Sequence, residues 1–339
     1  MQLTFESINS LVIHPFTGVD DPRLKKNLQN ISQNFTINRD KLSQYLENDE
    51  MVSAYTLFYM PTGFVKFSWL MKKLDQSLAQ SFSDYDFIDL GSGPGTYSAA
   101  FLDYVGEGYQ GSVYAHETSP FMSKQAKETI KNLFPKFLSF SVNTEMKSGR
   151  KKILFFGNSF NEMGNTLARS YIKKFDPSVI IFLEPGTKDV FSNILPMREE
   201  LIKSGFQVAY PCPNHKQCPM EGKDDWCHQV MKTTHHPSIE QLSQILQKDR
   251  RSMPMVAHVY VKDSVVSAQN RIVRIMPPTK FSYEFQLCRE NTLVKVETMK
   301  KKYNKDQKSI IEELSFGDKL ELEVEKVLPD GKLRAKIHE

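Results

Sequence analysis

Short apolar runs alternate with amphipathic stretches from about residue 86 to residue 210, and this alternation predicts the core of the fold. Apolar runs bounded by turn residues predict β-strands at residues 87–90, 112–116, 137–142, 153–156, 179–183 and 206–209. Apolar positions at helical spacing predict the intervening helices, at residues 96–104, 121–133, 165–175 and 190–204. The alternation predicts an α/β fold, with a doubly wound, mostly parallel sheet covered by helices on both faces.

The flanking segments follow other patterns. Residues 1–80 predict an N-terminal helical region, because apolar residues recur at helical spacing at Leu24, Leu28 and Ile31 and at Leu42, Tyr45 and Leu46. We expect a Rossmann-like domain at 81–210, a cysteine-rich, metal-binding insertion at 211–236 and a return to the sheet at 237–280. Residues 281–339 alternate as strands do. The turn Pro329-Asp-Gly331 predicts a hairpin within a small C-terminal β-domain.

Composition and charge narrow the class of protein. The chain has 339 residues, 40% hydrophobic and 25% charged, which is typical of a globular protein. No apolar stretch is long enough to cross a bilayer, and the N-terminus lacks the pattern of a secretory or mitochondrial leader. We therefore expect a cytoplasmic location, no membrane association and a monomer.

Basic clusters suggest a nucleic-acid partner. The net charge is only +4, but basic residues gather at Lys25-Lys26, Arg150-Lys-Lys152, Lys248 with Arg250-Arg251, Arg271 with Arg274, and Lys300-Lys-Lys302. Such clusters can neutralise phosphates. For any single cluster a solvated surface or loop end is the preferred interpretation, and only the five clusters together indicate nucleic-acid binding.

A glycine-rich turn stands between the first predicted strand and its helix, as Asp89-Leu-Gly-Ser-Gly-Pro-Gly95. Glycines let the backbone approach a ligand closely, and the following helix presents its positive end. The spacing differs from the G-x-G-x-x-G of dinucleotide sites, and Pro94 lacks the N–H that a pyrophosphate would use. The turn resembles the first motif of class I S-adenosylmethionine (SAM) methyltransferases. Glu117, at the end of the second strand, could accept both ribose hydroxyls of SAM.

Further candidates lie at the carboxyl ends of later strands, where open sheets place ligands. Asn158, Asn161 and Glu162 follow the fourth strand and could be cofactor or acceptor groups or helix caps, and Glu184 follows the fifth. The predicted cofactor-binding set is Asp89, Gly91, Ser92, Gly93, Gly95, Glu117 and Asn158. No catalytic residue is identified, because the chain has neither an Asn-Pro-Pro-Tyr tetrad after the fourth strand nor a cysteine placed as a nucleophile.

The four cysteines form a second candidate site. Cys212, Cys218 and Cys227 lie within one irregular loop, and Cys288 ends a later strand. Four thiolates suit zinc or an iron–sulfur cluster. Paired C-x(2–4)-C knuckles are absent, so the spacing fits a cluster better, while His215 and His228 leave a mixed Cys/His zinc site open. Four unligated thiols are the remaining alternative.

These pieces together resemble the mitochondrial small-ribosomal-subunit methyltransferase-like proteins and their bacterial and archaeal relatives. The resemblance rests on the glycine turn, Leu183-Glu-Pro-Gly-Thr187, Pro211-Cys-Pro through Cys218-Pro, and Asp225-Trp-Cys-His228. The chain departs from many relatives at Thr233-Thr-His-His-Pro237, where they carry a basic run.

The resemblance implies a SAM-type fold, binding to ribosomal RNA of the small subunit during ribosome assembly, and a bacterial-type member. It also implies a [4Fe–4S] cluster on Cys212, Cys218, Cys227 and Cys288. It leaves methyl transfer unsettled. Three hypotheses follow: an rRNA methyltransferase, a non-catalytic assembly factor stabilised by the cluster, and a zinc-containing methyltransferase for a non-RNA substrate.

Overall fold

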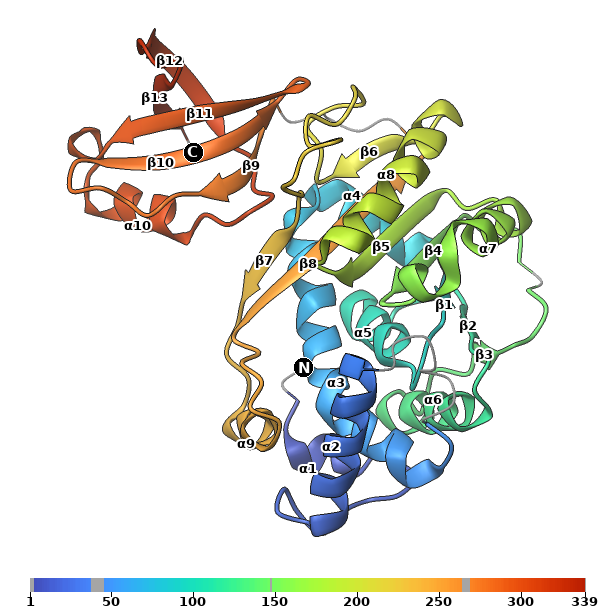
Figure 1. Ribbon diagram of the computed structural model, residues 1–339. Helices are drawn as coiled ribbons and strands as arrows, with labels where there is room; N and C mark the ends of the chain where they lie inside the picture. Colours follow the sequence, from blue (N-terminus) through green and yellow to red (C-terminus); the bar gives the residue numbers. More distant parts are fainter. Residues whose placement is uncertain (1–2, 38–45, 147, 264–268, 339) are drawn as a thin grey trace. The chain divides into compact units, whose positions relative to one another are not determined.

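The computed structural model describes residues 3–37, 46–146, 148–263 and 269–338, which fall into two compact units. The first unit comprises Met1–Glu162, Arg169–Pro177 and Lys232–Met253. The second comprises Met163–Ala168, Ser178–Met231 and Pro254–Glu339. Figure 1 labels the elements of both units.

The sheet of the first unit is parallel throughout. It contains β1 (Asp86–Leu90), β2 (Val113–His116), β3 (Phe140–Val142) and β4 (Lys152–Gly157), in the order β3-β2-β1-β4. Every residue of β1 is buried, as expected for a central strand. The chain runs outward from β1 through β2 and β3 and returns on the other side of β1 at β4. The strand order therefore reverses at β1, which creates a ligand-binding crevice at its carboxyl end in sheets of this kind.

Helices of the first unit pack around this sheet. They include α5 (Thr96–Val105) and α6 (Pro120–Leu133), both predicted, and the long α3 (Asp49–Lys73), which contacts both. Gly63 of α3 allows a close approach to α5, because a Cβ there would lie 2.4 Å from Cγ2 of Thr96. The mostly parallel α/β fold predicted from the sequence is confirmed.

The N-terminal region is helical, as predicted. It contains α1 (Phe5–Asn9), α2 (Pro22–Ile37), α3, α4 (Gln76–Ser81) and the 3₁₀ turn η2 (Phe82–Asp84). Leu24, Leu28 and Ile31 all lie on the buried face of α2. The second predicted set begins at Leu42 and Tyr45, which lie outside the described residues.

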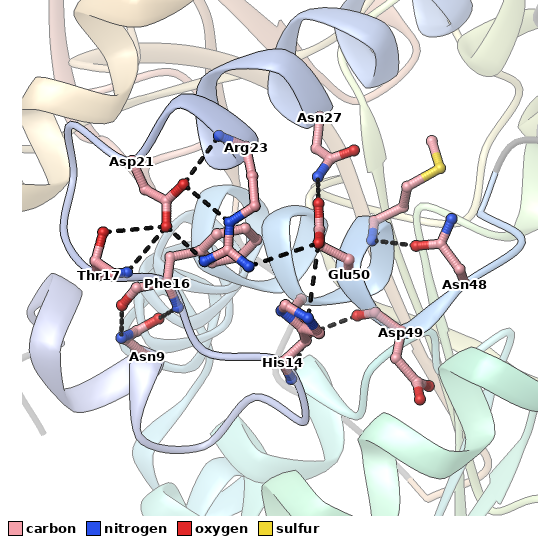
Figure 2. A network of polar contacts seen from close by, with 12 residues as sticks. Asn9, His14, Phe16, Thr17, Asp21, Arg23, Asn27, Asn48, Asp49 and Glu50 are labelled. Carbon is pink, nitrogen blue, oxygen red and sulfur yellow. Dashed lines mark hydrogen bonds and ion pairs between the residues drawn. The ribbon is translucent and has the colours of Figure 1, made fainter.

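A polar network ties the start of α2 to α3 (Figure 2). Asp21 accepts hydrogen bonds from Nη2 of Arg23 (2.8 Å) and from the backbone N–H of Thr17 (3.0 Å). The Arg23 guanidinium holds the pKa of Asp21 well below its usual range. Arg23 also lies 3.9 Å from the carboxylate of Glu50 on α3, which accepts a 2.6 Å hydrogen bond from Asn27.

The second unit has an antiparallel segment of sheet. In it β8 (Ser252–Val261) lies between β5 (Val179–Pro185) and β6 (Gln207–Tyr210), antiparallel to both. The short strand β7 (Gln229–Lys232), which the pattern did not predict, pairs with β8. The helix α8 (Lys188–Lys203) confirms the predicted helix after β5.

Two further helices lie mostly or wholly in the first unit. The helix α7 (Phe160–Phe175) begins five residues before its predicted start, and Gly164, with φ 76° and ψ 163°, kinks it there. The predicted start at 165 therefore marks the kink. The helix α9 (Pro237–Ile245) was not predicted.

The C-terminal β-domain has its own sheet and core. Its elements are β9 (Asn270–Ile275), β10 (Ser282–Arg289), β11 (Thr292–Met299), η3 (Lys300–Lys302), α10 (Lys305–Glu313), β12 (Glu321–Val327) and β13 (Leu333–His338). The strand order is β12-β13-β11-β10-β9, with β11 and β13 parallel and the other pairs antiparallel. The predicted hairpin is confirmed as β12–β13, and Gly331 in its turn has φ 79°.

No helix within the described residues is both long and apolar enough to span a membrane.

Candidate cofactor site and cysteine pocket

The glycine turn joins β1 to α5 with three residues in the left-handed region: Gly91, Gly93 and Gly95 have φ values of 67°, 54° and 80°. A Cβ on Gly91 would lie 2.6 Å from Cβ of Ser159, and one on Gly95 would lie 3.2 Å from the Ala126 backbone. These two glycines are therefore needed for close packing. A Cβ on Gly93 would meet nothing described within 4 Å, so this part of the turn faces open space. Sheets of this kind bind ligands where the strand order reverses, and a glycine backbone that faces open space lets a ligand approach closely.

Asp89 supports the turn from beneath. Its side chain is completely buried, and its Oδ2 accepts hydrogen bonds from the backbone N–H (3.0 Å) and the hydroxyl (2.8 Å) of Ser98 on α5. Burial raises the pKa of Asp89 to about 7, although the Ser98 hydrogen bonds oppose the rise. The neighbouring Ser92 is buried too, and its backbone N–H donates to the carbonyl of His116 (3.1 Å). Asp89 and Ser92 therefore fix the conformation of the turn relative to α5 and β2.

Glu117 is fixed at the carboxyl end of β2, against the turn. Its Oε2 accepts the backbone N–H of Gly93 and its Oε1 accepts that of Ser119, both at 2.8 Å. Asn143, at the end of β3, bonds both the N–H and the carbonyl of Glu117 through its side chain (3.0 and 2.7 Å). A carboxylate has about four lone-pair sites, so Glu117 keeps capacity for further donors such as ribose hydroxyls.

Asn158 lies at the end of β4, beside β1 in the sheet. It is exposed, has φ 57°, and donates from Nδ2 to the hydroxyl of Tyr97 (3.1 Å). The next residue, Ser159, donates its hydroxyl to the carbonyl of Leu90 (2.6 Å), which joins this loop to the glycine turn.

Tyr97 belongs to this site but was not found from the sequence. Its ring lies against Gly157, where a Cβ would come within 2.3 Å of the ring. The available signal was Gly157, an unexpected glycine at the end of an apolar strand, which marks a close approach.

Acidic and phenolic groups lie close enough to Glu117 for their charges to interact with it. Glu162, in the first turn of α7, is solvent-accessible, yet the surrounding protein, and to a smaller degree Glu117, raise its pKa to about 7. Burial raises the pKa of Tyr55 on α3 well above its usual value, with smaller contributions from Tyr59, Glu162, Tyr97 and Glu117. The side chains of these groups are thus close enough to interact. Asn161 is exposed beside Glu162, while Glu184 is fully buried in β5 of the second unit.

The four cysteines are brought together, wholly within the second unit. Cys212, Cys218, Cys227 and Cys288 line a single pocket, with Cys288 contributed by β10 and the other three by the insertion. Burial raises the pKa of Cys218 to about 11 and that of Cys288 to about 12, and in both cases the neighbouring cysteines add to the rise. All four thiols are free of disulfides. The sequence therefore predicted correctly which residues would gather, although Cys288 is distant in sequence.

A buried arginine forms part of the same pocket. Arg198 of α8 is 1% exposed, and its Nη2 donates to the carbonyls of Asn214 (3.2 Å) and Lys216 (2.8 Å) in the insertion. Burial, the largest single influence, lowers its pKa, but the interactions with Cys212, Tyr260 and Glu199 together outweigh burial and raise it. Arg198 thus braces the loop and brings a positive charge beside sulfur.

The histidines of the insertion have other roles. Nε2 of His215 accepts the backbone N–H of Val208 (3.1 Å), and Nδ1 of His228 lies 3.2 Å from the carbonyl of Trp226. Neither is among the described residues that line the cysteine pocket. Over the described part of the chain, no group of three or more His, Cys, Asp or Glu side chains is arranged to hold a single metal ion.

Solved structures similar to the chain are methyltransferases at low identity. A proposed RNA methyltransferase from Pyrococcus horikoshii shares 15% identity over 60% of this chain and 86% of its own, with a TM-score of 0.37. Magnesium protoporphyrin IX methyltransferase from Synechocystis PCC 6803, with bound S-adenosylhomocysteine, shares 12% over 66% of this chain and all of its own, with a TM-score of 0.40. An O-methyltransferase family protein from Burkholderia thailandensis shares 12% over 71% and 72%, also with a TM-score of 0.40.

No curated protein matches the sequence. The sequence model of one family, described as mitochondrial small ribosomal subunit Rsm22, matches residues 49–321. This match includes the glycine turn, the cysteine insertion and most of the C-terminal β-domain. Because it spans well over half of the chain, the protein belongs to the Rsm22 family.

Proposed function

We propose that the protein binds SAM at the glycine turn and acts on the RNA of the small ribosomal subunit during its assembly. The observation that carries the SAM proposal is the pairing of Gly93 with Glu117. The turn is open on the side of Gly93, and a fixed carboxylate lies beside it. Together they offer a close backbone surface and an acceptor for a ribose diol.

The remaining groups suit the charge of SAM. Bound SAM supplies an electrophilic methyl group on a positively charged sulfonium. The carboxylates of Glu117 and Glu162 interact with each other at this site, and a cation between them would lower the free energy of both. Asn158 and Tyr97, joined by a hydrogen bond, would orient the cofactor or the acceptor from the end of β4.

Methyl transfer needs little from the protein beyond position. A lone pair of the acceptor attacks the methyl carbon as the carbon–sulfur bond breaks, and the acceptor then loses a proton. Glu162, accessible and with a pKa of about 7, is suited to take up that proton near neutral pH. Holding the two reactants in line supplies most of the remaining acceleration.

The partner is proposed from the family. Its description names the small ribosomal subunit, and the basic clusters of this chain suit a polyanion. Incubation with SAM labelled in its methyl group and with precursor small-subunit particles tests the reaction. Label in the rRNA that is lost in Glu162→Gln supports methyl transfer, while unlabelled RNA after full binding excludes it.

A second candidate is a non-catalytic assembly factor. It is favoured by the segment after β4, Asn158-Ser-Phe-Asn161, which lacks the Asn-Pro-Pro-Tyr tetrad of amino-methyltransferases. Sedimentation with precursor particles separates the two functions. An assembly factor co-sediments without labelling RNA, whereas a free-standing methyltransferase labels RNA and leaves the particle.

We also propose a [4Fe–4S] cluster on the four cysteines. Four thiols around one pocket, with the buried charge of Arg198 beside Cys212, form a donor set that suits a cluster of net negative charge. A zinc ion with bonds of about 2.3 Å draws four thiolates to within about 4 Å of one another. In a cluster each thiolate binds a different iron, so the sulfurs lie farther apart. The described residues contain no such close single-ion group, so the proposal rests on the four thiols and Arg198, and metal analysis tests it.

Anaerobic purification decides between the metals. A brown protein with about four irons per chain and visible charge-transfer absorbance supports the cluster. A colourless protein with one zinc per chain supports the zinc-containing alternative, and one free of both metals contradicts both.

A further inference from the structure

The C-terminal β-domain closes into a barrel. At one edge of its sheet, β9 also bonds to the segment that leads into β12. The backbone N–H of Ile272 donates to the carbonyl of Asp318 (3.0 Å), and that of Gly317 donates to the carbonyl of Ile272 (2.7 Å). Arg271 and Lys319 form an antiparallel bridge there. The hydrogen bonds therefore run from β9 through β10, β11, β13 and β12 and back to β9.

This connectivity is that of an OB-fold. Three antiparallel strands, β9, β10 and β11, are followed by the helix α10 and then by β12 and β13, with β13 parallel to β11. A five-stranded Greek-key barrel with these features binds oligonucleotides on the face of its second and third strands and on its first–second and fourth–fifth loops. In this chain they are β10, β11, residues 276–281 and residues 328–332.

The first loop adjoins η3, and contacts join the base of the second loop and β12 to them. The backbone N–H of Lys300 donates to the carbonyl of Phe281 (2.9 Å), and its Nζ donates to that of Thr279 (2.7 Å). Lys332 in the second loop lies 3.0 Å from Glu284 on β10. An ion pair between Lys302 and Glu325 joins η3 to β12. These segments therefore form one continuous surface, here called the loop end.

The loop end is basic and carries an exposed aromatic ring. Its positive residues are Lys280, Lys300, Lys301, Lys302, Lys326, Lys332 and Arg334, and its acidic residues are Glu284, Glu297, Glu325 and Asp330, which leaves an excess of three positive charges (seven minus four). Three of the four acids already pair with Lys332, Arg334 and Lys302. Phe281 is 64% exposed, and Nζ of Lys280 lies 5.5 Å from the centre of its ring.

The adjoining strand face is polar. Tyr283, Phe285 and Leu287 of β10 point into the barrel core, so the alternate residues, Gln286 among them, point outward. Gln286 pairs with the exposed Lys295 of β11. A polar strip, which carries Lys295 together with the paired Glu284 and Glu297, thus extends from the loop end onto the face of β10 and β11.

We propose that the loop end and this strand face bind single-stranded RNA, with Phe281 stacking on a base and Lys280, Lys301 and Lys326 contacting phosphates. Unpaired bases stack on exposed aromatic rings and the backbone follows positive charge, whereas a duplex hides its bases. The choice of RNA over DNA rests on the proposed function. The expected contacts to base and phosphate rest only on the residues described above.

Fluorescence anisotropy with the full-length protein tests this inference. The probe is a labelled 12-nucleotide oligouridylate, with a 12-base-pair RNA duplex as competitor. We expect the single strand to bind more tightly than the duplex, and Phe281→Ala to weaken binding about tenfold. The triple variant Lys280→Gln/Lys301→Gln/Lys326→Gln should lower the slope of log affinity against log salt by about 2, since each phosphate contact on a single strand contributes about 0.7.

A double variant on α10, Lys305→Gln/Ile310→Ala, is the matched control. It also removes an exposed charge and an exposed apolar side chain, and should bind like the wild type. Wild-type affinity in the Phe281 and triple-lysine variants, or preference for the duplex, would overturn the inference. Titrating SAM into the same samples separates the two proposals. Retained SAM binding without RNA binding refutes only the barrel site, whereas RNA binding without SAM binding refutes only the SAM site.

Discussion

Replacing Gly93 by alanine separates ligand contact from backbone strain in the glycine turn. Gly93 has φ 54°, and a Cβ placed on it would meet no described atom within 4 Å. The methyl group therefore disturbs no packing, and the expected loss of stability is the left-handed penalty alone, about 1–2 kcal/mol. The same methyl group projects into the space that the proposed cofactor would fill.

Two other glycines provide the comparisons. Gly205, after α8, has φ 91° and equally open surroundings. Because this φ lies beyond the left-handed range of L-residues, Gly205→Ala should lose at least as much stability and keep its affinity for SAM. Gly91→Ala adds a 2.6 Å approach to Cβ of Ser159, which forces the β4–α7 loop to move, and should destabilise the protein more than either. Backbone strain alone therefore does not predict a loss of SAM affinity in Gly93→Ala that is absent from Gly205→Ala.

Calorimetric titration of SAM and thermal melting measure both quantities. We expect Gly93→Ala to melt at a temperature no lower than that of Gly205→Ala and to bind SAM at least tenfold more weakly than the wild type, a loss of about 1.4 kcal/mol. Equal SAM affinity in the Gly93 and Gly205 variants would refute the assignment of this open side to the cofactor.

Three further predictions concern the buried groups. Folding raises the pKa of Asp89 from 3.8 to about 7, so its ionisation lowers the free energy of unfolding as the pH rises between these values. In urea titrations, Asp89→Asn should therefore stabilise the protein by about 2 kcal/mol more at pH 8 than at pH 5.5. An equal effect at the two pH values would contradict this expectation. Cys218→Ser should lose the metal and expose residues 211–236 to protease while the first unit stays folded, because metal binding folds such a loop; a metal-free but protease-resistant loop would contradict this. Arg198→Leu leaves the carbonyls of Asn214 and Lys216 without their charged donor. It should therefore lower the free energy of unfolding by about 3 kcal/mol or more. A change below about 1 kcal/mol in thermal melts would show that these two hydrogen bonds do not stabilise the loop.

Local patterns predicted much of the fold. Apolar runs such as residues 153–156 become central strands because both faces of a parallel sheet are buried, and the glycine turn is recognisable because its glycines are needed locally. The grouping of the cysteines was also predicted, although Cys288 was included because four thiolates suit one metal site and not because of its spacing.

Features that depend on distant contacts were not predicted. The hydrogen bond from Asn158 to Tyr97 joins residues 61 apart, and the closure of the barrel joins β9 to residues 317–320. A strand pattern also carries no direction, so it did not show that β8 runs antiparallel to β5. The buried role of Asp89 was hidden for a similar reason: its motif suggested a ligand group, while its contacts are with Ser98 of α5.

The proposed SAM site consists of the glycine turn and Glu117. Calorimetric titration of SAM into the full-length protein, purified without oxygen, is its sharpest test. We expect one SAM bound per chain and a loss of at least tenfold in affinity for Glu117→Ala. An absence of SAM binding by the folded, metal-loaded protein, or unchanged affinity in Glu117→Ala, would contradict it.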